Sequence, residues 1–113
     1  MRYAVFAILL GVALARASGR QTDLRLAAER AKIDAVDRRV VALLNERAIL
    51  VRDIGRIKQQ SGAAVNDPSR VAEVLRRVTG ANRGPLPNAH LQRIYEVIVR
   101  EMTAFEAQEM SRQ

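Results

Sequence analysis

The chain has 113 residues, enough for one domain; 49% of them are apolar and only 4% are aromatic, a composition typical of packed helices. It contains no cysteine, which excludes a disulfide framework, a thiol nucleophile and a cysteine-ligated metal site. The formal net charge is +7, from 19 Lys plus Arg against 12 Asp plus Glu, and this excess favours an anionic partner.

Nucleic acid and a small anionic metabolite are the two candidate partners for such a charge. The sequence has no zinc-finger motif, no block of Lys and Arg, and no aromatic residues interleaved with basic ones, so nucleic acid is not favoured. The single histidine, His90, lies between Ala89 and Leu91 and is typical of a surface or helix-capping position. We therefore expect no metal-dependent chemistry.

Residues 1–17 have the layout of a secretory signal peptide. A short basic start at Arg2 precedes an apolar run over residues 3–15, and small residues precede a cleavage point after Ala17. The apolar run is too short for a comfortable membrane span. We expect residues 18–113 to form the mature domain, periplasmic or secreted and free of the membrane. The alternatives are an uncleaved anchor, or a misassigned start codon in front of a cytoplasmic protein.

A long first helix is predicted from about residue 23 to residue 60. This segment has no proline and one glycine, Gly55. Its apolar residues recur at helical spacing: Leu26, Ile33, Val36, Val40, Leu43, Leu44, Val51, Ile54 and Ile57. At about 1.5 Å per residue the helix would be roughly 55 Å long, which is too long for one monomer to cover its apolar stripe. A partner chain is therefore expected.

Two further helices follow. Ser61 and Gly62 end the first helix, Asp67 is a candidate N-cap, and Pro68 suits the first position of a short second helix that ends at Gly80. Residues 82–87 have the composition of a turn. The apolar residues of the third helix are Leu91, Ile94, Tyr95, Ile98, Met102 and Phe105. The predicted fold is all-α, with three helices per chain in the order long, short, medium.

Cationic residues interrupt the apolar stripe of the long helix. Arg47 lies at sevenfold spacing with Ile33, Val40 and Ile54, and Lys58 falls within about 20° of Arg47 on the helical wheel. Arg30 lies near the edge of the stripe. A buried guanidinium needs an anion, which can be an acidic side chain of another helix or a bound ligand. The pattern alone leaves a small-anion site and a structural ion-pair network as equal alternatives.

Five segments carry a resemblance to a known family: RAKIDAVD at 30–37, LLNER at 43–47, IGRIK at 54–58, NDPSR at 66–70 and NRGPLP at 82–87. In this order and spacing they resemble the all-helical AroQ class of chorismate mutases, the type II fold, over residues 26–106. The resemblance implies an intertwined helical homodimer with active sites shared between chains. It also implies conversion of chorismate, a dianion, to prephenate in phenylalanine and tyrosine biosynthesis, without metal or cofactor.

The same resemblance assigns three cations to the substrate. Arg47 would hold one carboxylate of chorismate, and Arg30, contributed by the partner subunit, would hold the other, a task for which bidentate arginine geometry is suited. Lys58 would donate to the ether oxygen whose bond to carbon breaks, and would stabilise the charge that grows there in the transition state.

Three further residues complete the implied site. Asp67 and Arg70 match residues that close over the side of the substrate that carries the ring hydroxyl. Glu106 matches a Gln or Glu that acts as a second donor to the ether oxygen. Because a carboxyl group donates only when it is protonated, activity is predicted to fall as pH rises through the titration of Glu106.

Two residues depart from the family pattern. Val71 stands where many members have Glu, and Met102 stands where some have Ser. Valine after the arginine matched by Arg70 also occurs in the related isochorismate pyruvate lyases of salicylate formation, which makes that reaction the second candidate function. A non-catalytic helical dimer that binds another macromolecule is the third, although a scaffold has no use for three cations in its apolar stripe.

Overall fold

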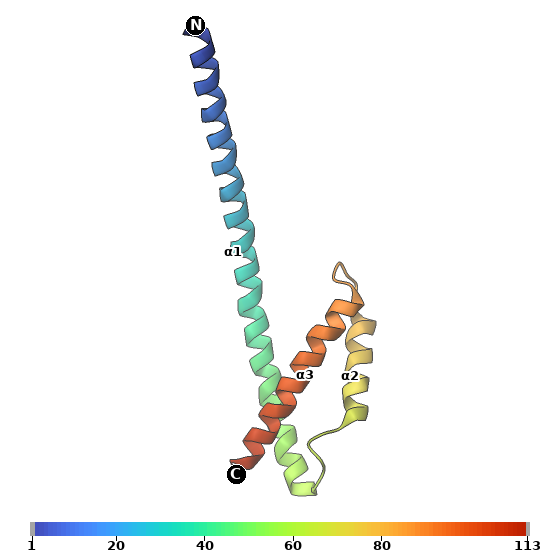
Figure 1. Cartoon of the computed structure of the whole chain (residues 1–113). Helices are drawn as coiled ribbons and strands as arrows, with labels where there is room; N and C mark the ends of the chain where they lie inside the picture. The colour runs from blue at the N-terminus through green and yellow to red at the C-terminus, as the bar shows by residue number, and fades with distance from the viewer. Residues whose placement is uncertain (1, 113) are drawn as a thin grey trace. The chain divides into compact units, whose positions relative to one another are not determined.

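The computed structural model describes the backbone of residues 2–112 and the side chains of residues 14–112. Over this part of the chain it contains three helices and no strand: α1 (Arg2–Ser61), α2 (Pro68–Ala81) and α3 (Asn88–Ser111) (Figure 1). The predicted all-α fold, with a long, a short and a medium helix, is confirmed. The chain divides into two compact units, residues 1–43 and residues 44–113, which are described separately.

Helix α1 begins earlier than predicted. It starts at Arg2 rather than near residue 23, because residues 2–22 contain no proline and consist mostly of residues that tolerate a helix. Met1 and the side chains of residues 1–13 lie outside the described part of the chain, so the signal peptide assigned to residues 1–17 stays a prediction. Among the described residues, no helix combines the length and the apolar character needed to cross a membrane.

The unit of residues 1–43 consists of α1 alone. Every side chain described in it, from Leu14 to Leu43, is exposed. This includes the apolar residues of the predicted stripe, such as Ile33 with 58% of its surface accessible and Val36 with 50%. Isolated exposed apolar residues are common on proteins, but a continuous helical stripe of them needs a covering surface.

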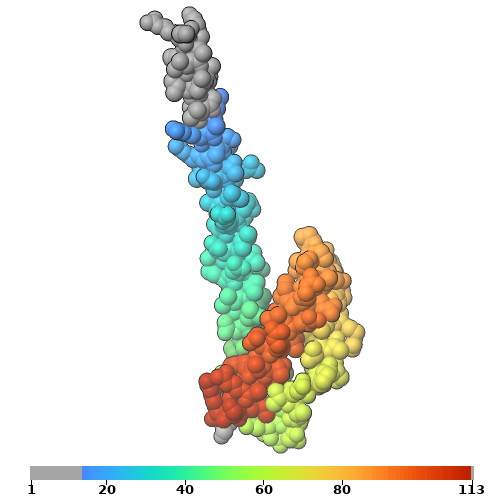
Figure 2. All heavy atoms as spheres, viewed as in Figure 1, coloured from blue at the N-terminus to red at the C-terminus, as the bar shows by residue number. Residues whose placement is uncertain are grey.

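The unit of residues 44–113 contains the end of α1 together with α2 and α3. Helices α2 and α3 lie side by side and antiparallel, and the C-terminal half of α3 covers the end of α1 (Figures 1 and 2). Near that end, the side-chain amide of Gln59 donates to the carbonyl oxygen of Met110 at 3.1 Å, which ties α3 to α1.

Local sequence signals set the helix ends of this unit. Gly62 has φ +73°, and the amide of Ala63 donates to the carbonyl of Lys58 at 3.0 Å, so α1 ends in the left-handed cap that glycine favours. Asp67 caps α2 through a hydrogen bond from the amide of Arg70 at 3.1 Å, with Pro68 in the first position, as predicted. Helix α2 ends at Ala81, one residue later than predicted.

The turn between α2 and α3 is organised by Asn82. Its side-chain amide donates to the carbonyl of Leu86 at 2.8 Å and to Oδ1 of Asn88 at 2.7 Å, while its own Oδ1 accepts from the amide of Gly84 at 3.0 Å. His90 lies exposed in the first turn of α3 with Nδ1 3.0 Å from Arg93, the surface position predicted for it. The turn places α3 beside α2, where the two helices form two walls of a pocket.

The described residues contain no buried hydrophobic side chain. The buried positions among them are Gly55 and Glu106, with Glu106 only 5% exposed. A 113-residue globular domain would normally bury many Leu, Ile and Val side chains. The part of the chain whose side chains are described therefore has no closed hydrophobic core, as the length argument for α1 predicts.

Candidate active site

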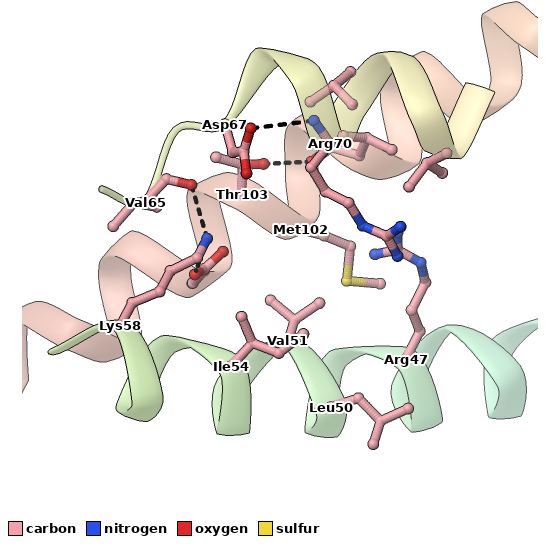
Figure 3. Close-up of a pocket in the computed structure, with 14 residues that line it drawn as sticks. Arg47, Leu50, Val51, Ile54, Lys58, Val65, Asp67, Arg70, Met102 and Thr103 are labelled. Carbon is pink, nitrogen blue, oxygen red and sulfur yellow. Dashed lines mark hydrogen bonds and ion pairs between the residues drawn. The ribbon is translucent and has the colours of Figure 1, made fainter. Parts of the chain in front are cut away.

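A pocket of about 330 Å³ lies within the unit of residues 44–113. All three helices and the loop after α1 contribute to its lining (Figure 3). Five of the six residues predicted to bind substrate line it: Arg47, Lys58, Asp67, Arg70 and Glu106. Most of the other lining residues are aliphatic or Met: Leu50, Val51, Ile54, Val65, Val71, Val74, Val99 and Met102.

Two arginines from different helices face each other across the pocket. Arg47 projects from α1 and Arg70 from α2, and their guanidinium groups point toward one another (Figure 3). Nη1 of Arg70 donates to Oε2 of Glu73 at 3.1 Å, whereas Arg47 forms no ion pair within the described part of the chain. Because two guanidinium groups repel each other, their convergence favours an anion between them.

Lys58 and Glu106 form an ion pair on another side of the pocket. Nζ of Lys58 lies 2.9 Å from Oε1 of Glu106, with the two side chains 20% and 7% exposed. Nζ also donates to the carbonyl oxygen of Val65 at 3.0 Å (Figure 3). An ammonium has three N–H donors, so at least one remains for a ligand. Of the two alternatives for the stripe cations, a structural ion pair is present at Lys58.

Asp67 stands at the rim of the pocket as part of the N-cap of α2. Its Oδ1 accepts from the hydroxyl of Ser69 at 2.8 Å and from the amide of Arg70 at 3.1 Å. The hydroxyl of Ser69 and then the amide of Arg70 lower the pKa of Asp67. The hydrogen bond from Arg70 likewise lowers the pKa of Glu73, with a further contribution from Arg77. Both carboxylates are therefore ionised at neutral pH.

Arg30 is not among the residues that line the pocket. It lies in the unit of residues 1–43, where its side chain is exposed. The prediction that Arg30 acts in the site of a partner subunit concerns a second copy of the chain and stays a prediction.

The prediction missed two polar groups of the pocket, Thr103 and the carbonyl of Val65. Thr103 is the one neutral polar side chain among the lining residues, and its hydroxyl donates to the carbonyl of Val99 at 2.9 Å. Its spacing of three residues from Glu106 puts both on one face of α3, a signal that could have found it. No side-chain pattern marks the carbonyl of Val65.

Val71 and Met102, which depart from the family pattern, both line the pocket.

The chemistry of the lining suits a small molecule with several negative charges and an apolar carbon frame. Three cations face two carboxylates, and aliphatic side chains fill the surface between them. In such a partly dry pocket each charge acts more strongly than in water. Within the described residues, no group of three His, Cys, Asp or Glu side chains is placed to hold a metal ion.

Comparisons with known proteins identify the family of the chain. The family model described as chorismate mutase type II matches residues 29–107. The solved chorismate mutase of Thermus thermophilus, form II, superposes with a TM-score of 0.71 at 34% identity, covering 74% of this chain and 94% of that one. A chorismate mutase of Methanocaldococcus jannaschii is 39% identical over 54 residues, 48% of this chain and 54% of that protein.

Longer relatives match as well. The bifunctional chorismate mutase/prephenate dehydratase of Neisseria gonorrhoeae is 38% identical over 84 residues, which is 74% of this chain and 23% of that protein. The chain thus spans about a quarter of the length of this bifunctional relative. The matched segment of 29–107 contains all six predicted site residues and both departures, Val71 and Met102. The chain belongs to the chorismate mutase type II family.

Proposed function

We propose that this protein is an isomerase that rearranges chorismate to prephenate, a step of phenylalanine and tyrosine biosynthesis. The observation that carries the proposal is the pocket itself, which is lined by charged side chains and by aliphatic ones. The charged residues that bear on the reaction are Arg47, Lys58, Arg70 and Glu106. The rearrangement is intramolecular: a carbon–oxygen ether bond breaks while a carbon–carbon bond forms, with no co-reactant. The protein then has to hold one conformer of the substrate and stabilise the charge that develops on it.

Arg47 would hold one carboxylate of the dianion, opposite Arg70. The convergence of the two guanidinium groups supports this placement, since a bound carboxylate relieves their repulsion (Figure 3). The partner subunit's Arg30 would hold the second carboxylate. Asp67 and Arg70 would face the part of the ring that carries the hydroxyl group, next to Val71.

Lys58 would act on the ether oxygen. As the carbon–oxygen bond breaks, negative charge grows on that oxygen, and the remaining N–H of the ammonium can donate to it. The hydrogen bond from Lys58 to the carbonyl of Val65 supports this role, because it holds the ammonium in place before the substrate arrives. Glu106, in its protonated form, would supply the second donor.

The homodimer is part of the proposal. A second copy would cover the exposed apolar face of α1, whose residues Ile33, Val36 and Val40 are 58%, 50% and 45% exposed. Burying apolar surface contributes about 25 cal/mol per Å², so pairing of two such helices gives the chain the core that a single copy lacks. The same pairing would bring Arg30 to the site of the partner.

An assay of the full-length protein with chorismate tests the proposal. We expect chorismate to disappear and prephenate to be its product. Val71, an apolar residue of the pocket, favours a second candidate, the cleavage of isochorismate to salicylate and pyruvate. Activity on isochorismate alone would replace the proposal by that reaction. A folded protein that turns over neither compound would indicate a binding role.

Replacing Glu106 with glutamine is expected to flatten the pH profile of kcat. The carboxyl group donates to the ether oxygen only when protonated, so wild-type activity falls as pH rises, whereas an amide donates at every pH. Steady-state kinetics measured from about pH 4 to about pH 9 give the profile, because this range covers the titration of carboxyl groups in proteins.

Glu101→Gln is the matched control, because Glu101 lies on α3 with its side chain 70% exposed. This variant should keep the wild-type pH profile. If the kcat of Glu106→Gln depended on pH as the wild-type kcat does, Glu106 would not be the proton-dependent donor.

A further inference from the structure

Gly55 is buried at the place where α3 lies against α1, three residues before Lys58. A Cβ atom at this position would lie 3.2 Å from Cγ of Glu106, 3.4 Å from Cγ of Met110 and 3.7 Å from Sδ of Met110. The first of these distances is shorter than ordinary van der Waals contact between carbon atoms. The absence of a side chain at residue 55 therefore leaves the space that the Glu106 side chain occupies.

The other helical glycines whose surroundings the structure describes show no such contact. A Cβ at Gly80, in α2, or at Gly19, in α1, meets no atom within 4 Å. Gly55 has no positive φ that would require glycine for the backbone, and alanine forms helices better than glycine does. A glycine at residue 55 thus costs helix stability locally, and the contact with α3 is the structural reason for it.

The neighbours of Gly55 leave the Glu106 side chain little freedom to move aside. Met110 occupies the next turn of α3, and its carbonyl accepts the hydrogen bond from Gln59 at 3.1 Å, which holds the helices together. Cγ of Glu106 is bonded to the carboxyl carbon, so any displacement of Cγ also moves Oε1, which lies 2.9 Å from Nζ of Lys58.

We propose that Gly55 is a positioning residue: by having no side chain it places the carboxyl group of Glu106 against the ammonium of Lys58. The catalytic part of the inference rests on the proposed function, because the pair would act together on the ether oxygen. The geometric part, the contact between residue 55 and Glu106, does not depend on which reaction the pocket performs.

The test compares Gly55→Ala with Gly80→Ala in the full-length protein. Both variants replace a helical glycine with a better helix former, but only the first introduces a contact with α3. We expect Gly55→Ala to lower kcat for chorismate about tenfold, because the new Cβ displaces the Glu106 side chain by a fraction of the roughly 1 Å misplacement that can cost a hundredfold. KM should change little, because Arg47 and Arg70 are untouched. Gly80→Ala should keep the wild-type kcat and KM.

A second pair of variants carries Glu106→Ala as background, which removes the Cγ atom that the new Cβ would meet. There, Gly55→Ala should cause no further loss of kcat. Gly55→Ala should lower the thermal unfolding temperature of the wild type and raise that of the Glu106→Ala background. Gly80→Ala should raise the unfolding temperature in both backgrounds. If Gly55→Ala alone does not fold, restored folding in the Glu106→Ala background supports the same contact.

Two results would overturn the inference. One is an unchanged kcat in a folded Gly55→Ala protein. The other is that Gly55→Ala lowers kcat or the unfolding temperature equally in the wild type and in the Glu106→Ala background. Wild-type protein without activity on chorismate would instead contradict the proposed function. In that case the unfolding temperatures of the four variants still decide whether Gly55 and Glu106 are in contact.

Discussion

Replacing Lys58 with methionine is expected to lower kcat for chorismate about a thousandfold, the upper range for loss of a single preorganised donor. Methionine keeps much of the length and apolar character of the side chain but has no N–H to offer the ether oxygen. The variant also leaves Glu106, whose side chain is 7% exposed, without the cation that lies 2.9 Å from it. A buried carboxylate that loses its partner destabilises the fold by about 3 kcal/mol.

Two further variants separate the chemical loss from the structural one. In the double variant Lys58→Met with Glu106→Gln, neither charge remains, so the free energy of unfolding should recover while kcat stays low. Lys32→Met is the matched control, since Lys32 pairs with Glu29 on the surface with 72% and 67% of the side chains exposed. It should change neither kcat nor stability measurably. Chorismate turnover near the wild-type rate in Lys58→Met would exclude Lys58 from the reaction.

Local sequence signals were sufficient to predict the ends of most helices. Gly62, Asp67 and Pro68 act through their own backbone conformation or through neighbours within three residues, so their effect can be read without the rest of the fold. The start of α1 was predicted wrongly, at residue 23 instead of Arg2. Amphipathic spacing marks the part of a helix that packs against another surface, and it gives no boundary where the composition permits the helix to continue.

The site could be predicted in part from periodicity and in part only from resemblance to a family. The spacing on one helix placed Arg47 and Lys58 on the same face, and both line the pocket. Nothing in the local pattern connects Lys58 with Glu106, because the pair is formed by packing between helices that are far apart in sequence. The close approach of Gly55 to Glu106 depends on the same packing between helices, so the local sequence pattern could not predict it either.

Arg30 is not among the residues that line the pocket, and the described residues bury no hydrophobic side chain. A sequence can indicate that an apolar helix face needs a cover, as the spacing of Ile33, Val36 and Val40 does, and the exposure of these residues agrees. Which residues the covering chain brings with it depends on the geometry of a second molecule. An experiment that mixes two different variants of the chain tests whether Arg30 acts in the site of the partner.

Arg30→Ala and Arg47→Ala are each expected to lower kcat/KM for chorismate between about a hundredfold and a thousandfold, because each removes a charged partner of a desolvated substrate carboxylate. If the active sites are shared, the two inactive variants should restore activity when they are refolded together. A mixed dimer then has one site that lacks both arginines and one that has both. With random pairing about half of the dimers are mixed, so the mixture should reach about a quarter of the wild-type activity.

The controls follow from the symmetry of the dimer. Arg47→Ala refolded with the double variant Arg30→Ala, Arg47→Ala has no complete site in any pairing and should stay inactive. Arg56→Ala should keep full activity alone, since Arg56 pairs with Asp53 on the surface with its side chain 53% exposed. Full activity of Arg30→Ala would show that the second carboxylate is held by another residue. Loss of activity in each variant without recovery in the mixture would show that Arg30 and Arg47 serve a site within one chain.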